Sequence, residues 1–216
     1  SFPTRRSSDL GKAAAAGDAT VRAPAGKGAA VDAATPASAR PDGAERLAAG
    51  VQQITELLAA DTLRLNDVLT LALATVHEAL QCQRVVLCLR DLKLDALTGR
   101  VGVGKDATTF ARAMRVPLTP SASPDLFAAV CAKGLDLQID DAGAAHVQQK
   151  LPAWFRQVTD APCFVLLPMK VRDKPFGLFY ADRAQAGTLA LSAAELSMLR
   201  TLRNQAVMAF RQAERG

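Results

Sequence analysis

The sequence predicts an α+β domain built on an antiparallel sheet. Two observations lead to this prediction. Apolar residues recur at helical spacings of three and four near residue 50 and again near residue 200. Between these segments lie short runs rich in Val and Leu that are separated by turn residues, a pattern typical of strands. Antiparallel hairpins with helices gathered beside them define the α+β class.

Two helices open the predicted domain. The first carries one apolar stripe, which consists of Leu47, Val51, Ile54 and Leu58. Asn66 is a good N-cap residue for the second helix. The apolar stripe of that helix consists of Leu69, Leu73, Val76 and Leu80.

Short strands and a short helix follow. The Val- and Leu-rich run at 84–91 predicts a buried strand, and turn residues at 95–99 return the chain into a second strand. A short helix over 106–113 is expected next. The extended piece at 114–118 contains Pro117, which indicates an edge position because proline cannot donate to a sheet ladder.

The next segment alternates between helix and strand. Residues 125–133 predict a helix that Gly134 ends. Apolar and polar residues alternate over 135–140, and this period of two predicts a half-exposed strand. A weaker helical stretch over 144–158 is interrupted by Pro152.

The strongest local signal is a hairpin near the end of the chain. Strand residues 163–170 and 175–181 flank the polar turn Arg172-Asp173-Lys174. Ser192 and Glu195 then form a capping box that opens the last helix. Its apolar stripe consists of Leu196, Leu199, Leu202, Ala206 and Phe210.

The first 44 residues are expected to lie outside the domain. Residues 1–10 resemble the translation of a sequencing-adapter oligonucleotide, and we interpret them as an artefact without fold information. Residues 11–44 contain 14 Ala, five Gly and three Pro and predict a disordered linker. A linker joins two parts, so a missing upstream domain is expected. The domain itself is assigned to 45–212, with a tail at 213–216.

Composition argues against several classes of protein. The net charge is +5, but acidic and basic residues are interspersed, and aromatic residues make up 5% of the chain. A nucleic-acid footprint normally clusters its basic residues and supplies aromatic stacking platforms. The longest apolar runs, such as 85–89, fall short of the roughly 20 residues that span a bilayer. We therefore expect no nucleic-acid partner and no membrane span.

The sequence resembles the GAF domains, the small-molecule sensor modules of signalling proteins. The resemblance rests on the helix-strand passage 66–91, on the hairpin from Val165 to Tyr180 and on the closing helix 191–211. It implies an antiparallel central sheet with the terminal helices packed on one face and short helices on the other. The Ala-, Pro- and Gly-rich linker also resembles that of bacterial HDOD-GAF proteins, which implies a cytoplasmic signal-transduction protein with an upstream HDOD domain.

The sequence lacks the residue patterns that characterise the ligand-binding and catalytic members of the family. The dispersed Asn-Lys-Phe-Asp-Glu set of cyclic-nucleotide-binding members cannot be placed, and neither Cys131 nor Cys163 has the adjacent His of a bilin site. The reactive-cysteine pattern of free-methionine-sulfoxide reductases does not align either. We therefore expect a non-catalytic regulatory domain that binds an unidentified small ligand or partner, and the sequence identifies no cofactor.

Other candidate chemical sites have simpler interpretations. The run 99–105 has the glycine and lysine spacing of a phosphate-binding loop, but Asp106 replaces the Ser or Thr that would hold magnesium. A strand-end loop explains it better. His146 follows Asp140 and Asp141 at a distance that permits a metal site, yet carboxylates before a helix usually offset its dipole. His77 is interpreted as a boundary residue of its helix. No metal and no catalytic residue is predicted.

A ligand pocket between the sheet and the short helices is the remaining candidate site. Its predicted apolar lining consists of Phe110, Phe127, Trp154, Phe155 and Phe179. Arg115 or Gln138 could supply the polar group that a mostly apolar pocket needs. The alternative for each aromatic ring is plain core packing, which would leave a degenerate sensor that serves only in assembly.

Two further hypotheses stay open. The apolar stripes of the terminal helices could form a homodimer, which would make the domain a ligand-free dimerisation module. A cysteine-based redox sensor or reductase would instead use Cys82, Cys88, Cys131 and Cys163. Their spacing shows no C-x-x-C motif, and free cysteines in apolar runs indicate a reducing, cytoplasmic compartment.

Overall fold

The structure, a computed structural model, describes residues 41–60 and 64–215. The expected adapter artefact and residues 11–40 of the expected linker lie outside this range. The helices are α1 (Pro41–Ala59), α2 (Leu65–Ala79), α3 (Ala107–Ala113), α4 (Leu126–Lys133), α5 (Ala145–Gln148), α6 (Ala153–Val158) and α7 (Ala193–Ala213). The strands are β1 (Arg84–Asp91), β2 (Ala96–Gly104), β3 (Arg115–Pro117), β4 (Leu137–Ile139), β5 (Cys163–Val171) and β6 (Lys174–Arg183).

The strands form one antiparallel sheet in the order β3-β2-β1-β6-β5-β4. The predicted hairpin is confirmed as β5 and β6, whose turn places Arg172 and Asp173 at positive φ. It lies at the centre of the sheet because β6 also pairs with β1. The short strand β3, which ends at Pro117, forms one edge as predicted, and β4 forms the other.

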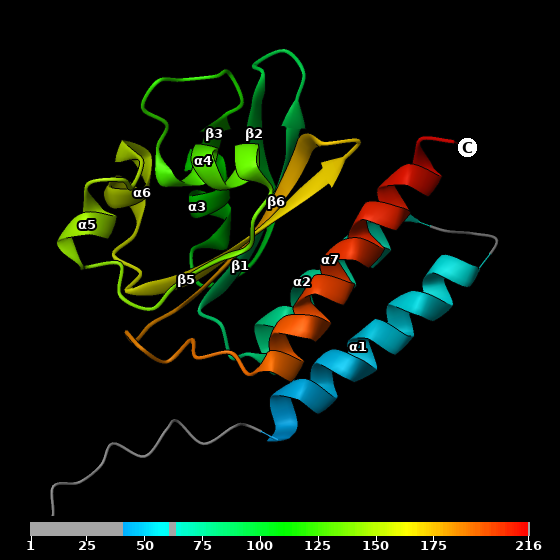
Figure 1. The fold of residues 1–216 in the computed structure, drawn as a ribbon. Coiled ribbons are helices and arrows are strands. Elements are labelled where there is room, and N and C mark those ends of the chain that lie inside the picture. Colours follow the sequence, from blue (N-terminus) through cyan, green and yellow to red (C-terminus); the bar gives the residue numbers. More distant parts are fainter. Residues whose placement is uncertain (1–40, 61–63, 216) are drawn as a thin grey trace, which may run out of the picture. The chain divides into compact units, whose positions relative to one another are not determined.

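Helices cover both faces of the sheet, and the α+β prediction is confirmed. Figure 1 shows α1, α2 and α7 together on one side and α3, α4, α5 and α6 on the other. Each side has its own apolar core, which we call the terminal-helix core and the short-helix core. Successive side chains of a strand point to opposite faces. In β6, Phe179 therefore enters the terminal-helix core and Tyr180 enters the short-helix core.

Close contacts hold the three long helices together. Gly50 of α1 packs against the side chain of Thr75 in α2, where any Cβ would collide with it. Gln205 of α7 donates from Nε2 to the carbonyl oxygen of Val51 at 3.0 Å and to Oγ1 of Thr55 at 2.9 Å. A polar bond between two helices fixes their register as well as their distance, so α1 is a structural part of the domain.

Three boundaries differ from the sequence-based expectation. Helix α1 begins at Pro41 instead of residue 45, because Gly43 is buried against the carbonyl oxygen of Ala79 and extends the packed face. Helix α2 has Arg64 at its N-cap, so Asn66 lies inside the first turn and does not cap it. Helix α7 runs to Ala213, one residue past the expected end of the domain. The capping box at Ser192 and Glu195 is confirmed.

Candidate ligand-binding site

Aromatic rings fill the space between the sheet and the short helices. Phe110, Phe127, Phe155, Phe164 and Tyr180 are almost fully buried and come from α3, α4, α6, β5 and β6. The rings of Phe110 and Tyr180 stack with centroids 4.6 Å apart, and those of Phe155 and Phe164 lie 5.3 Å apart. These distances are those of well-packed aromatic pairs. Phe110 and Phe127 are thus core residues, as the alternative interpretation of the sequence allowed.

Trp154 forms the outer surface of this aromatic cluster. Its half-buried ring meets Phe110 edge-on at 5.6 Å and Phe127 edge-on at 5.4 Å. Its indole Nε1 is buried and has no hydrogen-bond partner in the part of the chain that the structure describes. A buried indole N–H usually finds an acceptor. The Trp154 ring is therefore held by packing against the two phenylalanine rings and not by a hydrogen bond among the described residues.

A cleft of about 610 Å³ opens beside Trp154, and we call it the Trp154 cleft. Its lining residues include Arg115, Pro117, Ser123, Asp125, Leu151 and Trp154. Arg115 is exposed on the edge strand β3, and its guanidinium makes no hydrogen bond or ion pair within residues 41–60 and 64–215. The cleft thus joins an aromatic wall to an unpaired guanidinium.

A second cleft, of about 640 Å³, adjoins the first and follows α4, and we call it the α4 cleft. It shares Ser123, Asp125 and Leu151 with the Trp154 cleft. Its other lining residues include Leu126, Ala129, Lys133, Leu135, Asp136, Leu137 and Lys150. Asp125 caps α4 by accepting a hydrogen bond from the Ala128 amide at 2.9 Å, so the shared wall is fixed.

The structure brings together only some of the predicted pocket residues. Arg115 and Trp154 line one cleft, and Phe110 and Phe127 lie directly beneath Trp154. Phe179 does not join them, because strand alternation places it on the opposite face of the sheet. Gln138 lies on the edge strand β4, where its Nε2 donates to Oδ1 of Asp140 at 2.7 Å, and it lines neither cleft.

Sequence reasoning missed a buried polar network at the end of the central strands. Arg84 donates from Nε to Oδ2 of Asp182 at 2.7 Å and from Nη2 to Oγ1 of Thr159 at 2.8 Å. The hydroxyl of Tyr180 donates to the same Asp182 oxygen at 2.6 Å. Burial raises the pKa of Asp182 and lifts that of Tyr180 well above its usual value. The β1–β6 register places Arg84 opposite Asp182, so strand pairing was the signal that would have revealed it.

The glycine-rich run at 99–105 is a packing feature of the sheet. Most of it lies within β2, so it is part of a strand and not the strand-end loop that the sequence favoured. A Cβ at Gly99 would collide with the carbonyl of Ala111, and one at Gly102 would crowd Ala107. Both contacts are with α3, so the two glycines allow this helix to approach the strand closely.

The expected alternatives to a ligand site can be placed as well. No cluster of three or more His, Cys, Asp or Glu side chains suited to a metal ion occurs among the described residues. All four cysteines are buried. Burial, followed by the Asp125 carboxylate, raises the pKa of Cys131 to about 12, and burial also raises the pKa of Cys88 and Cys163. Reactive cysteines need an accessible thiolate, which these environments disfavour.

The arrangement defines a class of protein: an antiparallel sheet between two helical layers, with a cleft on the short-helix side. The model of the GAF domain family matches residues 64–210, which is more than half of the chain. The chain therefore belongs to the GAF domain family. GAF domains are sensory and regulatory modules of signalling proteins.

Solved structures agree with this fold at low sequence identity. The GAF domain of a phosphoenolpyruvate-protein phosphotransferase from Acinetobacter is 19% identical, with a TM-score of 0.61, 79% of this chain covered and 93% of that one. The free methionine-R-sulfoxide reductase of Neisseria meningitidis is 18% identical, with a TM-score of 0.57 and coverages of 81% and 96%. A GAF domain/HD domain protein from Geobacter sulfurreducens is 16% identical, with a TM-score of 0.57 and coverages of 72% and 97%. None of the curated protein sequences matches this chain.

Proposed function

We propose that this domain is a non-catalytic sensor that binds a small anionic ligand with an apolar or aromatic body in the Trp154 cleft. One observation supports this most directly: the unpaired guanidinium of Arg115 shares the cleft with the half-buried ring of Trp154. Ligand sites typically combine apolar walls with a few placed polar groups.

A ligand acts here by binding two conformations unequally, because only differential affinity shifts an equilibrium. The aromatic cluster beneath Trp154 is tightly packed, so the ligand would occupy the cleft above it and not the core. The short-helix layer would therefore respond mainly through the segments that line the clefts.

Trp154 makes the proposal easy to test, because it is the one tryptophan in the sequence. A panel of nucleotides, cyclic nucleotides, amino acids and aromatic carboxylates would be titrated while tryptophan fluorescence and the melting temperature are recorded. A true ligand should change both. The variant Arg115→Gln should weaken its binding roughly 10- to 100-fold, since a hydrogen bond to a charged group contributes ~1.5–3 kcal/mol.

The matched control is Arg112→Gln, which removes an exposed charge from nearby α3 without touching the cleft. It should leave the affinity unchanged. A panel in which no compound alters fluorescence or melting, or in which both variants weaken binding equally, would overturn the proposal for this cleft.

A homodimer through α1 and α7 is a second proposed activity, and it can coexist with sensing. Helix α7 exposes Met208, whose side chain is 50% accessible, beside polar and small residues. Sedimentation velocity across a range of concentrations would test this. Met208→Lys should shift a dimer toward monomer, whereas a wild-type chain that stays monomeric at all concentrations would eliminate the dimerisation proposal.

The cellular setting is proposed from the same observations. We place the domain in a cytoplasmic bacterial signalling protein, downstream of an HDOD domain that the Ala-, Gly- and Pro-rich residues 11–44 would connect to it. Across the described residues, no helix combines the length and apolarity needed to cross a membrane. The sequence of the intact gene would test the upstream domain directly.

The redox alternative has less support. Each cysteine is buried, and three of the thiols have raised pKa values. Single Ser replacements that left a peroxide response unchanged would eliminate it. A response that vanished with one replacement would instead revive it and argue against the non-catalytic assignment.

A further inference from the structure

An acidic residue on the wall of the α4 cleft is held by two arginines of the last helix. Arg200 donates from Nε to Oδ2 of Asp136 at 2.7 Å, and Arg203 donates from Nη1 to Oδ1 at 2.5 Å. We call these three residues the Asp136 clamp. The Asp136 side chain is only 14% exposed and that of Arg203 17%, while that of Arg200 is 49% exposed. Arg203 therefore forms the better shielded half of the clamp.

The cleft side of the clamp is short and stiff. Asp136 lies two residues after Gly134, which ends α4 in the left-handed conformation with φ of 67°, and one residue before β4 begins. Leu135, Asp136 and Leu137 all line the α4 cleft. Asp136 is thus separated from the end of α4 by two residues and is directly followed by β4. A displacement of α4 relative to β4 would therefore move its carboxylate.

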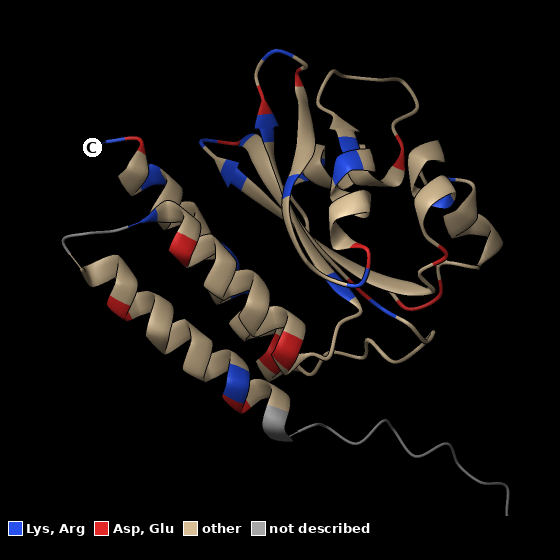
Figure 2. Cartoon of the chain, turned by 180° about the vertical axis from the view of Figure 1, so that it is seen from behind, with Lys and Arg blue, Asp and Glu red and all other residues tan. Residues whose placement is uncertain are grey.

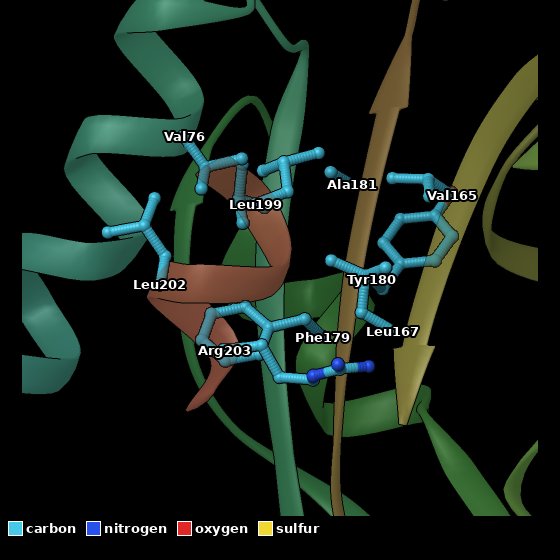
Figure 3. Close-up of a pocket in the computed structure, with 10 residues that line it drawn as sticks. Val76, Val165, Leu167, Phe179, Tyr180, Ala181, Leu199, Leu202 and Arg203 are labelled. Carbon is cyan, nitrogen blue, oxygen red and sulfur yellow. The ribbon is translucent and has the colours of Figure 1, made fainter. Parts of the chain in front are cut away.

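The helix side of the clamp lies beside a small cavity. A small apolar cavity of about 10 Å³ lies between α7 and the sheet, and Figure 3 shows Arg203 extending across it near Phe179 and Leu167. Leu199 and Leu202 of α7 line the same cavity. Both leucines are almost fully buried, so the clamp attaches next to a packed part of α7.

The clamp also occupies a distinctive position among the ion pairs. The other ion pairs that the structure describes in full join strands of the sheet or lie within the β1–β2 hairpin. Figure 2 shows basic and acidic positions together at the turn of the β1–β2 hairpin, where the Arg90–Asp95 pair is local. Only the Asp136 clamp, in this described part, ties α7 to a wall of the α4 cleft by charge.

We infer that the Asp136 clamp is a coupling device that transmits occupancy of the α4 cleft to α7. Filling the cleft displaces Asp136, and the two arginines follow it or release it. In either case the charge contact that holds α7 to the cleft wall changes. The inference rests on the proposed sensing function for its purpose, because the α4 cleft shares Ser123, Asp125 and Leu151 with the Trp154 cleft proposed for the ligand. The coupling itself requires no ligand.

A substitution can imitate occupancy of the cleft. Ala129 and Ala122 line the α4 cleft, so Ala129→Phe and Ala122→Phe each place a ring in it. An environment-sensitive dye attached through Ser197→Cys reports on α7, because position 197 is exposed and the four native thiols are buried. The quantity measured is the shift in dye emission that each filling substitution causes.

We expect both filling substitutions to shift the emission in the parent chain, and the shift to be lost when Asp136→Asn is added. Asp160→Asn is the matched control, because this exposed carboxylate belongs to neither clamp nor cleft. It should preserve the shift. Asp136→Glu, which keeps the charge, should restore part of it. Circular dichroism and a melting curve would establish that each variant is folded.

Two outcomes would overturn the inference. One is a folded parent chain in which neither filling substitution shifts the dye emission. The other is a shift that persists undiminished with Asp136→Asn, which would mean that α7 responds through the sheet alone. Failure of the ligand titration with an intact shift would reject the proposed ligand and leave the coupling standing, so the two failures are distinguishable.

Discussion

At the scale of single residues, the buried ion pair at the centre of the sheet is the most consequential polar feature. Arg84 is 4% exposed and Asp182 is fully buried, and one Asp182 oxygen, Oδ1, has no hydrogen-bond partner among the described residues. The Arg84 guanidinium also lies 4.9 Å from the centre of the Phe110 ring. Removing one member of a buried pair leaves the other charge uncompensated, which is more destabilising than removing both.

This reasoning gives a prediction for paired substitutions. Arg84→Met should lower the free energy of unfolding by about 3–5 kcal/mol, because it leaves the buried Asp182 carboxylate without a positive partner. Adding Asp182→Asn should recover part of that loss, since a neutral amide can still accept the Tyr180 hydroxyl. Urea unfolding at pH 7 measures both, with Arg112→Met as the exposed control. Strictly additive losses in the double variant would contradict it.

The thiol of Cys131 predicts a pH dependence of stability. Its folded pKa of about 12 exceeds the unfolded value of about 8.5. The folded state therefore keeps its proton longer than the unfolded state. The stability contributed by the neutral thiol is complete below about pH 8.5 and declines as the pH rises toward the folded value.

Cys131→Ala should remove part of this decline, while Cys88, Cys163 and Tyr180, whose pKa values burial also raises, keep the rest. Urea unfolding between pH 8 and 10.5 would show a shallower slope for the variant. Val130→Ala is the control for the cavity, because it truncates a buried neighbour in α4 without changing an ionisable group. Equal slopes for both variants and the parent would show that the thiol is not responsible.

At the scale of elements, Gly99 and Gly102 allow α3 to approach β2 closely. Gly99→Ala should destabilise the protein by about 1–3 kcal/mol, the usual range for overpacking, because the new methyl group would meet backbone atoms of Ala111. Gly143→Ala is the control, since its nearest neighbour is a side-chain oxygen of Asp141 at 3.0 Å. Thermal unfolding of the two variants side by side decides the matter, and equal stability would refute the packing role of Gly99.

The element scale also shows where sequence reasoning was limited. Hairpin turn, capping box and edge strand were predictable because each depends on a few neighbouring residues. The face of the sheet on which Phe179 lies was not predictable, because β6 is buried on both sides. Its continuous apolar run from Phe176 to Tyr180 hides the alternation of side chains between the two faces. When both faces of a strand are buried, the sequence does not show which residues point to which face.

At the scale of the whole molecule, the sheet order could be anticipated only in part. Hairpin neighbours follow from short turns, but the β1–β6 pairing joins segments about ninety residues apart and creates the Arg84–Asp182 pair. Arg115 and Trp154 also meet through tertiary structure, since β3 and α6 are not adjacent along the chain. Residue type suggested both as ligand contacts, and only the fold could bring them together.

The same architecture predicts how the described domain unfolds. The two cores share one sheet, and β6 contributes alternate residues to each of them, so loss of either core exposes the other. Trp154 reports on the short-helix side, whereas far-ultraviolet circular dichroism reports mainly on α1, α2 and α7. Both signals should follow one urea transition. Leu202→Ala, which truncates the terminal-helix core, should lower both midpoints together by removing about 2–5 kcal/mol. A tryptophan transition that stayed at the parent midpoint would show that the two layers unfold as separate units.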